Sequence, residues 1–160
     1  QEAGSKPPSI GFILATKLGF ARTLDFAGRA TRSEYWFWGF FSVLAGLAGA
    51  YADSIVGGIA GDWLTVGNLL YVACLVPFVS VSFRRLHDIG RSGLWLFAPT
   101  ALTLLGSVLS GTGMEAVSTA LGVTGFVLSL VVLRWLGKPG DQRSNHYGPT
   151  RNMTLAMELA

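Results

Sequence analysis

Hydrophobic residues along this chain fall into long blocks, with no sustained alternation of apolar and polar positions. A helix of about 18 residues spans roughly 27 Å, close to the thickness of the hydrocarbon layer of a bilayer. Apart from Arg134 near the end of the last block, the blocks contain no Asp, Glu, Lys, Arg or His. The pattern predicts an all-α polytopic membrane protein with four transmembrane helices, at residues 35–52, 64–83, 94–110 and 117–136.

Small residues and prolines refine this picture of the spans. Ser42, Gly46 and Ala50 recur every four positions, a spacing that lets helix backbones approach closely inside a bundle. Pro77 and Pro99 are expected to kink the second and third spans. With no ionisable group at membrane depth, the spans also argue against an ion pump or a proton relay.

The flanking segments are polar or only weakly apolar. Residues 10–26 have apolar positions at helical spacing, and Lys17 and Arg22 could reach lipid phosphates, so we expect an amphipathic helix on the inner membrane surface. The first residues, rich in Gly, Ser and Pro, indicate a disordered lead. The predicted organisation is a lead, a membrane domain and a tail, at residues 1–9, 10–149 and 150–160.

The basic residues set the orientation of the spans. Of the twelve Lys and Arg, five precede the first span, three lie between the second and third, and four lie at the end of the last span or after it. The only charged residues of the other two loops are acidic: Asp53, Asp62 and Glu115. The positive-inside rule therefore predicts that both termini and the middle loop lie in the cytoplasm of a bacterial inner membrane.

Two basic segments, 25–36 and 84–95, each lead into a predicted span. Thr31 and Glu34 have the spacing of a capping box, in which the hydroxyl accepts from a backbone N–H and the carboxylate reaches back. Ser92 is a candidate N-cap of the third span.

These segments read Gly-Arg-Ala-Thr-Arg-Ser-Glu-Tyr-Trp and Arg-Arg-Leu-His-Asp-Ile-Gly-Arg-Ser-Gly-Leu-Trp, and a third, at 137–149, reads Gly-Lys-Pro-Gly-Asp-Gln-Arg-Ser-Asn-His-Tyr-Gly-Pro. Together they resemble the domain-of-unknown-function 805 family, small inner-membrane proteins of the YhaH type. The resemblance covers roughly residues 15–149. Thr150 and Arg151 depart from it, because they stand where the family has an acidic ending. The resemblance implies a four-span inner-membrane protein and no particular activity.

The polar residues of these segments lie at one membrane face and permit two interpretations. In the first, carboxylates pair with arginines of another segment and lock the segments together, because the arginine fork suits carboxylates. This network would contain Thr31, Glu34, His87, Asp88, Ser92 and Asn145. In the second, unmatched positive charge holds an anionic lipid headgroup or a small anion. The candidate anion-binding residues are Arg29, Arg32, Arg84, Arg85 and Arg91.

Both interpretations can hold at once. We expect Glu34 or Asp88 to pair with an arginine of the other segment, and Arg32 or Arg85 to face a phosphate. A catalytic site is disfavoured: His87 and Asp88 are adjacent and point in different directions on a helix, and no nucleophile has a base beside it.

The leading functional prediction is a non-enzymatic structural or accessory component of a membrane assembly, with membrane lipids and other membrane-protein subunits as partners. The alternative is a binding or transport protein that holds an anionic headgroup or small anion. No cofactor and no metal site are expected, because Cys74 is the single cysteine and lies in an apolar block. Nucleic acid is not an expected partner, because the positive residues lie in short loops at a bilayer edge.

Overall fold

The computed structural model describes residues 10–56, 64–151 and 153–154. The lead predicted at 1–9 and most of the predicted tail lie outside these residues. The described chain is all-α, as predicted. It contains five α-helices and one 3-10 helix: α1 Phe12–Ala21, α2 Arg32–Val56, α3 Val66–His87, η1 Gly93–Leu96, α4 Ala98–Leu109 and α5 Glu115–Gly137.

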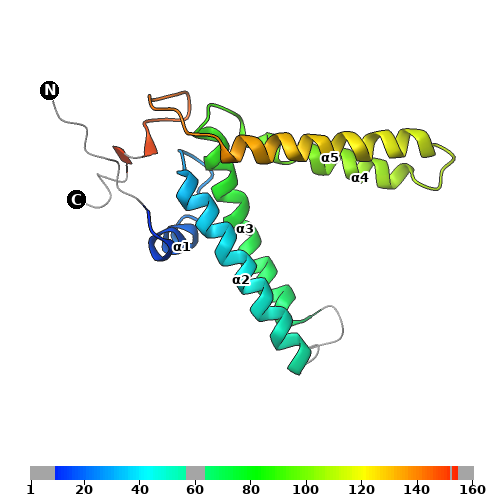
Figure 1. The fold of residues 1–160 in the computed structure, drawn as a ribbon, viewed down its shortest axis with the longest axis horizontal. Coiled ribbons are helices and arrows are strands. Elements are labelled where there is room, and N and C mark those ends of the chain that lie inside the picture. The colour runs from blue at the N-terminus through cyan, green and yellow to red at the C-terminus, as the bar shows by residue number, and fades with distance from the viewer. Residues whose placement is uncertain (1–9, 57–63, 152, 155–160) are drawn as a thin grey trace.

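Helices α2 and α3 form one long hairpin (Figure 1). Their backbones approach closely near its far end, where a Cβ on Gly49 would lie 2.6 Å from the Cα of Gly67. The Asp53 carboxylate accepts a hydrogen bond from the Gly67 N–H at 3.0 Å and so satisfies one of the free donors at the start of α3. Helix α3 continues through Pro77 as α-helix.

Helices α4 and α5 form a second, separate hairpin (Figure 1). Gly106 and Gly125 allow these helices to pack closely, because a Cβ at either position would press on the backbone of the other helix. The Ser118 hydroxyl also donates to the Gly106 carbonyl at 2.8 Å. The two hairpins meet at one end and diverge from it, which leaves their far ends apart (Figure 1).

The third predicted span is the main correction to the predicted fold. Within the described residues, three helices are long and apolar enough to cross a membrane, α2, α3 and α5, and not four. The segment predicted as a span at 94–110 is η1 followed by α4, whose 12 residues give a length of ~18 Å. Pro99 lies in the first turn of α4, where its missing N–H is tolerated, so the α-helix begins only there. It ends before Gly111, which has φ +78.

Helix α1 is shorter than the predicted segment 10–26 and packs against the start of α2. Gly19 lies so close to the Trp38 ring that a Cβ there would collide with it. The Phe12 ring packs edge-on against the Phe37 ring, with centroids 6.1 Å apart. The Phe20 ring also packs edge-on against the Trp38 ring, with centroids 4.9 Å apart, whereas Ile13 and Lys17 are exposed.

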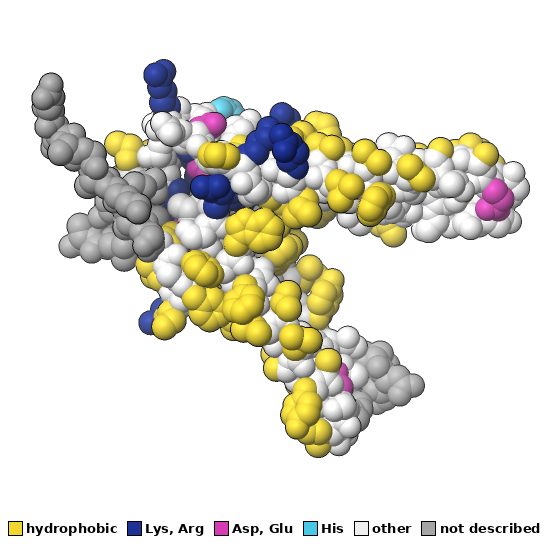
Figure 2. Space-filling model, in the orientation of Figure 1, with side chains coloured by type: hydrophobic (Ala, Val, Ile, Leu, Met, Phe, Trp, Pro, Cys, Tyr) yellow, Lys and Arg dark blue, Asp and Glu magenta, His cyan; other side chains and the backbone are white. Residues whose placement is uncertain are grey.

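The hydrophobic core lies at the end where the two hairpins meet. Its buried residues come from the loop before α2 and from α2, α3 and α5: Ala30, Tyr35, Trp38, Val81, Leu86, Val132 and Leu136. Toward the far ends, most apolar side chains of the helices are exposed (Figure 2). Lys and Arg side chains gather around the joined end together with some acidic ones, whereas the charged side chains seen at the far ends are acidic (Figure 2).

Candidate functional site

The candidate site begins where the loop before α2 lies against the last turns of α3. The Ser80 hydroxyl hydrogen-bonds to the carbonyls of Arg22 and Asp25, at 2.9 and 2.7 Å. The Ala30 N–H donates to the Arg84 carbonyl at 3.0 Å. These contacts hold the first basic segment against the second, although more than 50 residues of sequence separate them.

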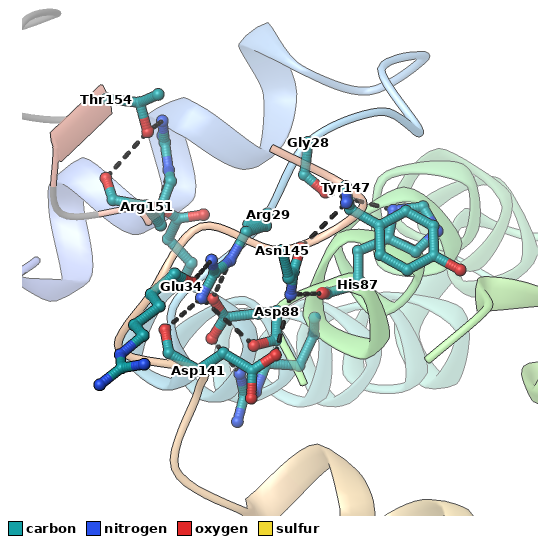
Figure 3. A network of polar contacts seen from close by, with 12 residues as sticks. Gly28, Arg29, Glu34, His87, Asp88, Asp141, Asn145, Tyr147, Arg151 and Thr154 are labelled. Atoms are coloured by element: carbon teal, nitrogen blue, oxygen red, sulfur yellow. Dashed lines mark hydrogen bonds and ion pairs between the residues drawn. The ribbon is translucent and has the colours of Figure 1, made fainter. Parts of the chain in front are cut away.

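Asp88 joins the two basic segments through its carboxylate. Arg29 Nε donates to Asp88 Oδ1 at 2.7 Å, and Arg85 Nη1 donates to Asp88 Oδ2 (Figure 3). The three residues are 3%, 0% and 6% exposed, in the order Arg29, Arg85 and Asp88. The ion pair expected between the two segments is therefore present, and it is buried. Both carboxylate oxygens are engaged, each by a different arginine.

The same two guanidinium groups bind the backbone at the end of α5 and beyond it. Arg85 Nε donates to the Leu136 carbonyl at 3.0 Å, and Arg85 Nη2 donates to the Lys138 carbonyl. Arg29 Nη1 donates to the Arg143 carbonyl at 2.8 Å. Because α5 and its following segment supply the acceptors, these hydrogen bonds tie the second hairpin to the first.

Asn145 and its neighbours complete this attachment. Asn145 Nδ2 donates to the His87 carbonyl at 2.9 Å and to the Asp141 carboxylate at 2.9 Å (Figure 3). The Asp141 N–H donates to the Asp88 carbonyl at 2.8 Å. The Tyr147 ring stacks on the His87 imidazole, with centroids 3.9 Å apart and planes 4° apart.

His87 therefore has structural contacts on several sides. Its Nδ1 lies 3.2 Å from the carbonyl of Gly28, a residue whose φ of +75 suits the tight turn of the loop. His87 and Asp88 are not aimed at a common point, because Asp88 is held between two arginines and His87 lies against Tyr147.

Glu34 forms a second buried cluster beside the first. The Thr31 hydroxyl accepts from the Glu34 N–H at 3.2 Å, which confirms Thr31 as the N-cap. The reciprocal half of the predicted capping box is absent: Glu34 Oε1 instead accepts from Arg151 Nε at 2.8 Å. Arg84 Nη1 lies 3.9 Å from Glu34 Oε2. Glu34, Arg84 and Arg151 are 2%, 1% and 3% exposed, respectively.

The sequence analysis missed Asp141 and Tyr147 of the Asp88 network, and it missed Arg151 of the second cluster. Arg151 stands in the predicted tail, at the position where the resemblance leads one to expect an acidic ending, and it contacts Glu34 across 117 residues of sequence. Its only signal in the sequence was its positive charge near the predicted cytoplasmic face.

The remaining candidate arginines differ in their surroundings. Arg84 and Arg85 are buried inside the protein, so the expectation that Arg85 faces a lipid phosphate is not met. The Arg91 guanidinium stacks on the Trp135 ring, 3.8 Å from its centroid. Arg32 is exposed and makes no hydrogen bond or ion pair with any residue of the described ranges. Ser92 caps η1, accepting from the Leu94 N–H at 3.3 Å.

A cleft of about 800 Å³ opens beside this network. Its walls include charged, hydroxyl and aromatic side chains of the loop before α2, of α2, and of the segment after α5. Among them are Arg29, Thr31, Arg32, Ser33, Trp36 and Arg151. In the part of the chain that the structure describes, no group of three or more His, Cys, Asp or Glu residues could hold a metal ion.

Comparison with known proteins agrees with the motif resemblance. The family described as "Protein of unknown function (DUF805)" matches residues 23–149. The inner membrane protein YhaI of Escherichia coli K12 is 38% identical over 73 residues, which cover 45% of this chain and 58% of YhaI. The uncharacterized protein YiiR of the same strain is 32% identical over 129 residues, 78% of this chain and 84% of YiiR.

A third relative is the inner membrane protein YhaH of Escherichia coli K12, 34% identical over 76 residues, 45% of this chain and 60% of YhaH. The matched region thus spans less than two thirds of YhaI and of YhaH. No solved structure matches the chain significantly. Because the family match covers most of the chain and contains all three motifs, this protein belongs to the DUF805 family.

Proposed function

We propose that this protein is a multi-pass, non-enzymatic component of a bacterial inner membrane, with a structural or accessory role in a membrane assembly. The observation that carries the proposal is the buried network around Asp88, which joins two apolar hairpins at one end. Two of its relatives are named as inner membrane proteins.

The network supports a structural role because its carboxylates form ion pairs with arginines of the same chain. Asp88 is held by Arg29 and Arg85, and Glu34 is held by Arg151. Burying such charges is expensive, and one attested benefit of buried polar groups is that they specify a single arrangement. Here the arrangement specified is the placement of the α2/α3 hairpin against the end of α5.

The apolar faces left exposed support an assembly role. Leu104, Val108, Val123 and Phe126 are among many large apolar side chains exposed on α4 and α5. In a bilayer such faces contact lipid tails or helices of other subunits. A junction that fixes the hairpins at one end would present these faces to partners in a defined geometry.

The same geometry supports four crossings of the membrane, with both termini cytoplasmic. The ends of α3 and α5 lie together at the network, and α5 is long and apolar enough to cross a membrane, so in this proposal its start lies on the opposite side. The chain must therefore cross the bilayer between these helices. The 3-10 helix η1 and helix α4 together cover residues 93–109, which at about 2.0 and 1.5 Å per residue reach roughly 26 Å. A broken span of this kind lets four crossings coexist with three long helices.

Two measurements test the proposal. After Ala160, a reporter that works only in the cytoplasm should be active. After Thr112, a reporter that works only outside the cytoplasm should be active. The opposite result at either site contradicts the topology. Native mass spectrometry of the gently solubilised protein should show a stoichiometric protein partner or a defined oligomer. A chain that is isolated only as a monomer without protein partners contradicts the assembly role.

A further inference from the structure

Arg32 differs from the other arginines of the joined end. Arg29, Arg84, Arg85 and Arg151 are buried, whereas Arg32 is exposed in the wall of the cleft. It lies in the first turn of α2, a 25-residue helix whose N-terminal end favours negative charge. The Thr31 and Ser33 hydroxyls line the same cleft.

The charges of the described residues around this cleft do not balance. The cleft is lined by three arginines, Arg29, Arg32 and Arg151, against the two carboxylates Asp88 and Asp141. The buried carboxylates are engaged by buried arginines. The excess positive charge is therefore available at the exposed position, Arg32.

An apolar groove of about 660 Å³ adjoins this cleft and runs between α2 and α3. Trp36 lines both the cleft and the groove, so the two lie next to each other at this side chain. The groove owes its depth to small residues on α2, among them Gly39, Ser42 and Gly46. A Cβ on Gly46 would meet no atom within 4 Å, so this glycine faces open space and does not support close packing of α2 on α3.

We propose that the cleft and the groove together bind one anionic phospholipid. Its phosphate is held by Arg32 and the neighbouring hydroxyl groups, and an acyl chain lies in the groove along Gly39 and Gly46. Arginine suits this role because its planar fork donates two hydrogen bonds to phosphate oxygens. Trp36 lies where headgroup and chain meet, the depth that tryptophan prefers at membrane interfaces.

The apolar groove distinguishes a phospholipid from a free anion. A soluble phosphate would need only the cleft. The adjoining groove is apolar, and its volume lies in the range of small-molecule sites, ~300–1,000 Å³, so it suits an acyl chain. The groove is formed by two helices suited to cross the membrane, so a lipid can reach it from the bilayer. The proposal does not depend on the assembly role: Asp88 and Arg29 line the cleft, but Arg32 and the groove residues take no part in the hydrogen bonds that join the hairpins.

Two variants and two matched controls test this site in the full-length protein. Arg32→Gln removes the exposed charge, and Gly46→Leu fills the groove. Arg143→Gln is the charge control, because Arg143 is an exposed arginine that does not line the cleft. Gly122→Leu is the steric control, because Gly122 is also a helical glycine with nothing within 4 Å of a Cβ, and it lies on α5.

Phosphatidylglycerol and phosphatidylcholine are titrated into each detergent-solubilised protein, and bound lipid is counted by native mass spectrometry. The parent and both controls should bind phosphatidylglycerol in preference to phosphatidylcholine. Arg32→Gln should weaken phosphatidylglycerol binding about tenfold, equivalent to ~1.4 kcal/mol. Gly46→Leu should weaken the binding of this lipid by a similar factor while the protein stays folded.

Three results would overturn the proposal. Equal binding by all five proteins would show that no specific site exists. If Arg32→Gln binds phosphatidylglycerol more weakly but Gly46→Leu binds it as tightly as the parent, the groove holds no acyl chain. Displacement of the lipid by an equal concentration of inorganic phosphate would show a free-anion site instead.

Discussion

The joined end of this molecule and the far ends of its two hairpins are held by different kinds of contact. At the joined end, two carboxylates and four arginines are buried together with a hydrophobic core. At the far end of the first hairpin, the close contacts are between glycines, supported by the Asp53 carboxylate. Apolar packing has no directional bonds, so helices packed in this way can shift between arrangements of similar energy. Buried charges with hydrogen bonds restrict such shifts, because a shift would leave a buried charge without its partner. The difference indicates that the arrangement of the hairpins is decided at the joined end.

The joined end also contains an internal contrast. The Arg29–Asp88 pair has side chains that are 1% and 8% exposed, whereas the Arg22–Asp25 pair has side chains that are 21% and 40% exposed. Both pairs have an N–O distance of 2.7 Å. Because the N–O distances are equal and burial differs, replacing Asp88 and Asp25 in turn compares a buried carboxylate held by two arginines with a half-exposed carboxylate held by one.

Removing the buried carboxylate should have the largest effect. Asp88→Asn leaves Arg29 and Arg85 buried without a counter-charge, and breaking a buried pair typically costs about 3–5 kcal/mol. The free energy of unfolding in detergent measures this loss. Asp25→Asn is the control and should cost no more than ~1 kcal/mol, because the Arg22–Asp25 pair is partly open to solvent. Equal losses in the two variants would remove the distinction between the buried pair and the partly exposed one.

Crowding the network from outside should have the next largest effect. A Cβ at Gly140 would collide with the Asp88 carboxylate, whereas a Cβ at Gly137 would meet nothing within 4 Å. Gly140→Ala should therefore destabilise the protein by about 1–3 kcal/mol, the usual range for overpacking. Gly137→Ala should leave the melting temperature unchanged or slightly higher. If both variants melt alike, Asp88 is not held as tightly as its contacts indicate.

Removing the N-cap of α2 should have a smaller effect. Thr31→Ala deletes the hydroxyl that accepts from the Glu34 N–H, which should cost about 0.5–2 kcal/mol. Thr31→Ser keeps that acceptor and should restore most of the stability. Failure of serine to restore it would show that the threonine methyl group, and not the cap, is what matters.

Breaking the partly exposed Arg22–Asp25 pair should have the smallest effect on stability, and this effect should depend on pH in the acid range. Burial raises the pKa of Asp25, but the hydrogen bond and charge of Arg22 lower it more, so the pKa lies below its ordinary value. A lowered pKa means that the pair stabilises the fold above the ordinary pKa of ~3.9, and that this contribution is lost as the pH falls through the folded-state pKa. Melting temperatures from pH ~7 to ~3 should converge for parent and Asp25→Asn at the acid end. A difference that grows in acid would contradict this sign.

The apolar blocks of the sequence predicted α2, α3 and α5, because a block long enough to cross a bilayer has few alternatives to a helix. The same reasoning failed for the segment at 94–110. The hydropathy of a segment does not predict that Pro99 fixes the start of α4, or that the chain turns at Gly111. Local backbone chemistry, and not apolarity, set the limits of that helix.

The site was predictable where a partner has a recognisable sequence signal. Thr31 as a cap, and the pairing of Glu34 or Asp88 with some arginine of the other segment, could be expected, because caps have fixed spacing and crowded arginines need a counter-charge. The burial of Arg85 could not be expected, because its guanidinium binds backbone carbonyls, which every residue possesses. Arg151 was missed because only the folded chain brings it to Glu34.

The central claim is that the buried network around Asp88 fixes the two hairpins relative to each other. Spin labels at Ser54 and Thr112, which are exposed near the far ends of the two hairpins, report this arrangement by electron–electron distance measurement in a Cys74→Ala background. We predict one narrow distance distribution for the parent, an equally narrow one for Asp25→Asn, and a broad or shifted one for Asp88→Asn. An unchanged distribution in Asp88→Asn would contradict the claim, because the hairpins would then keep their arrangement without the buried charges.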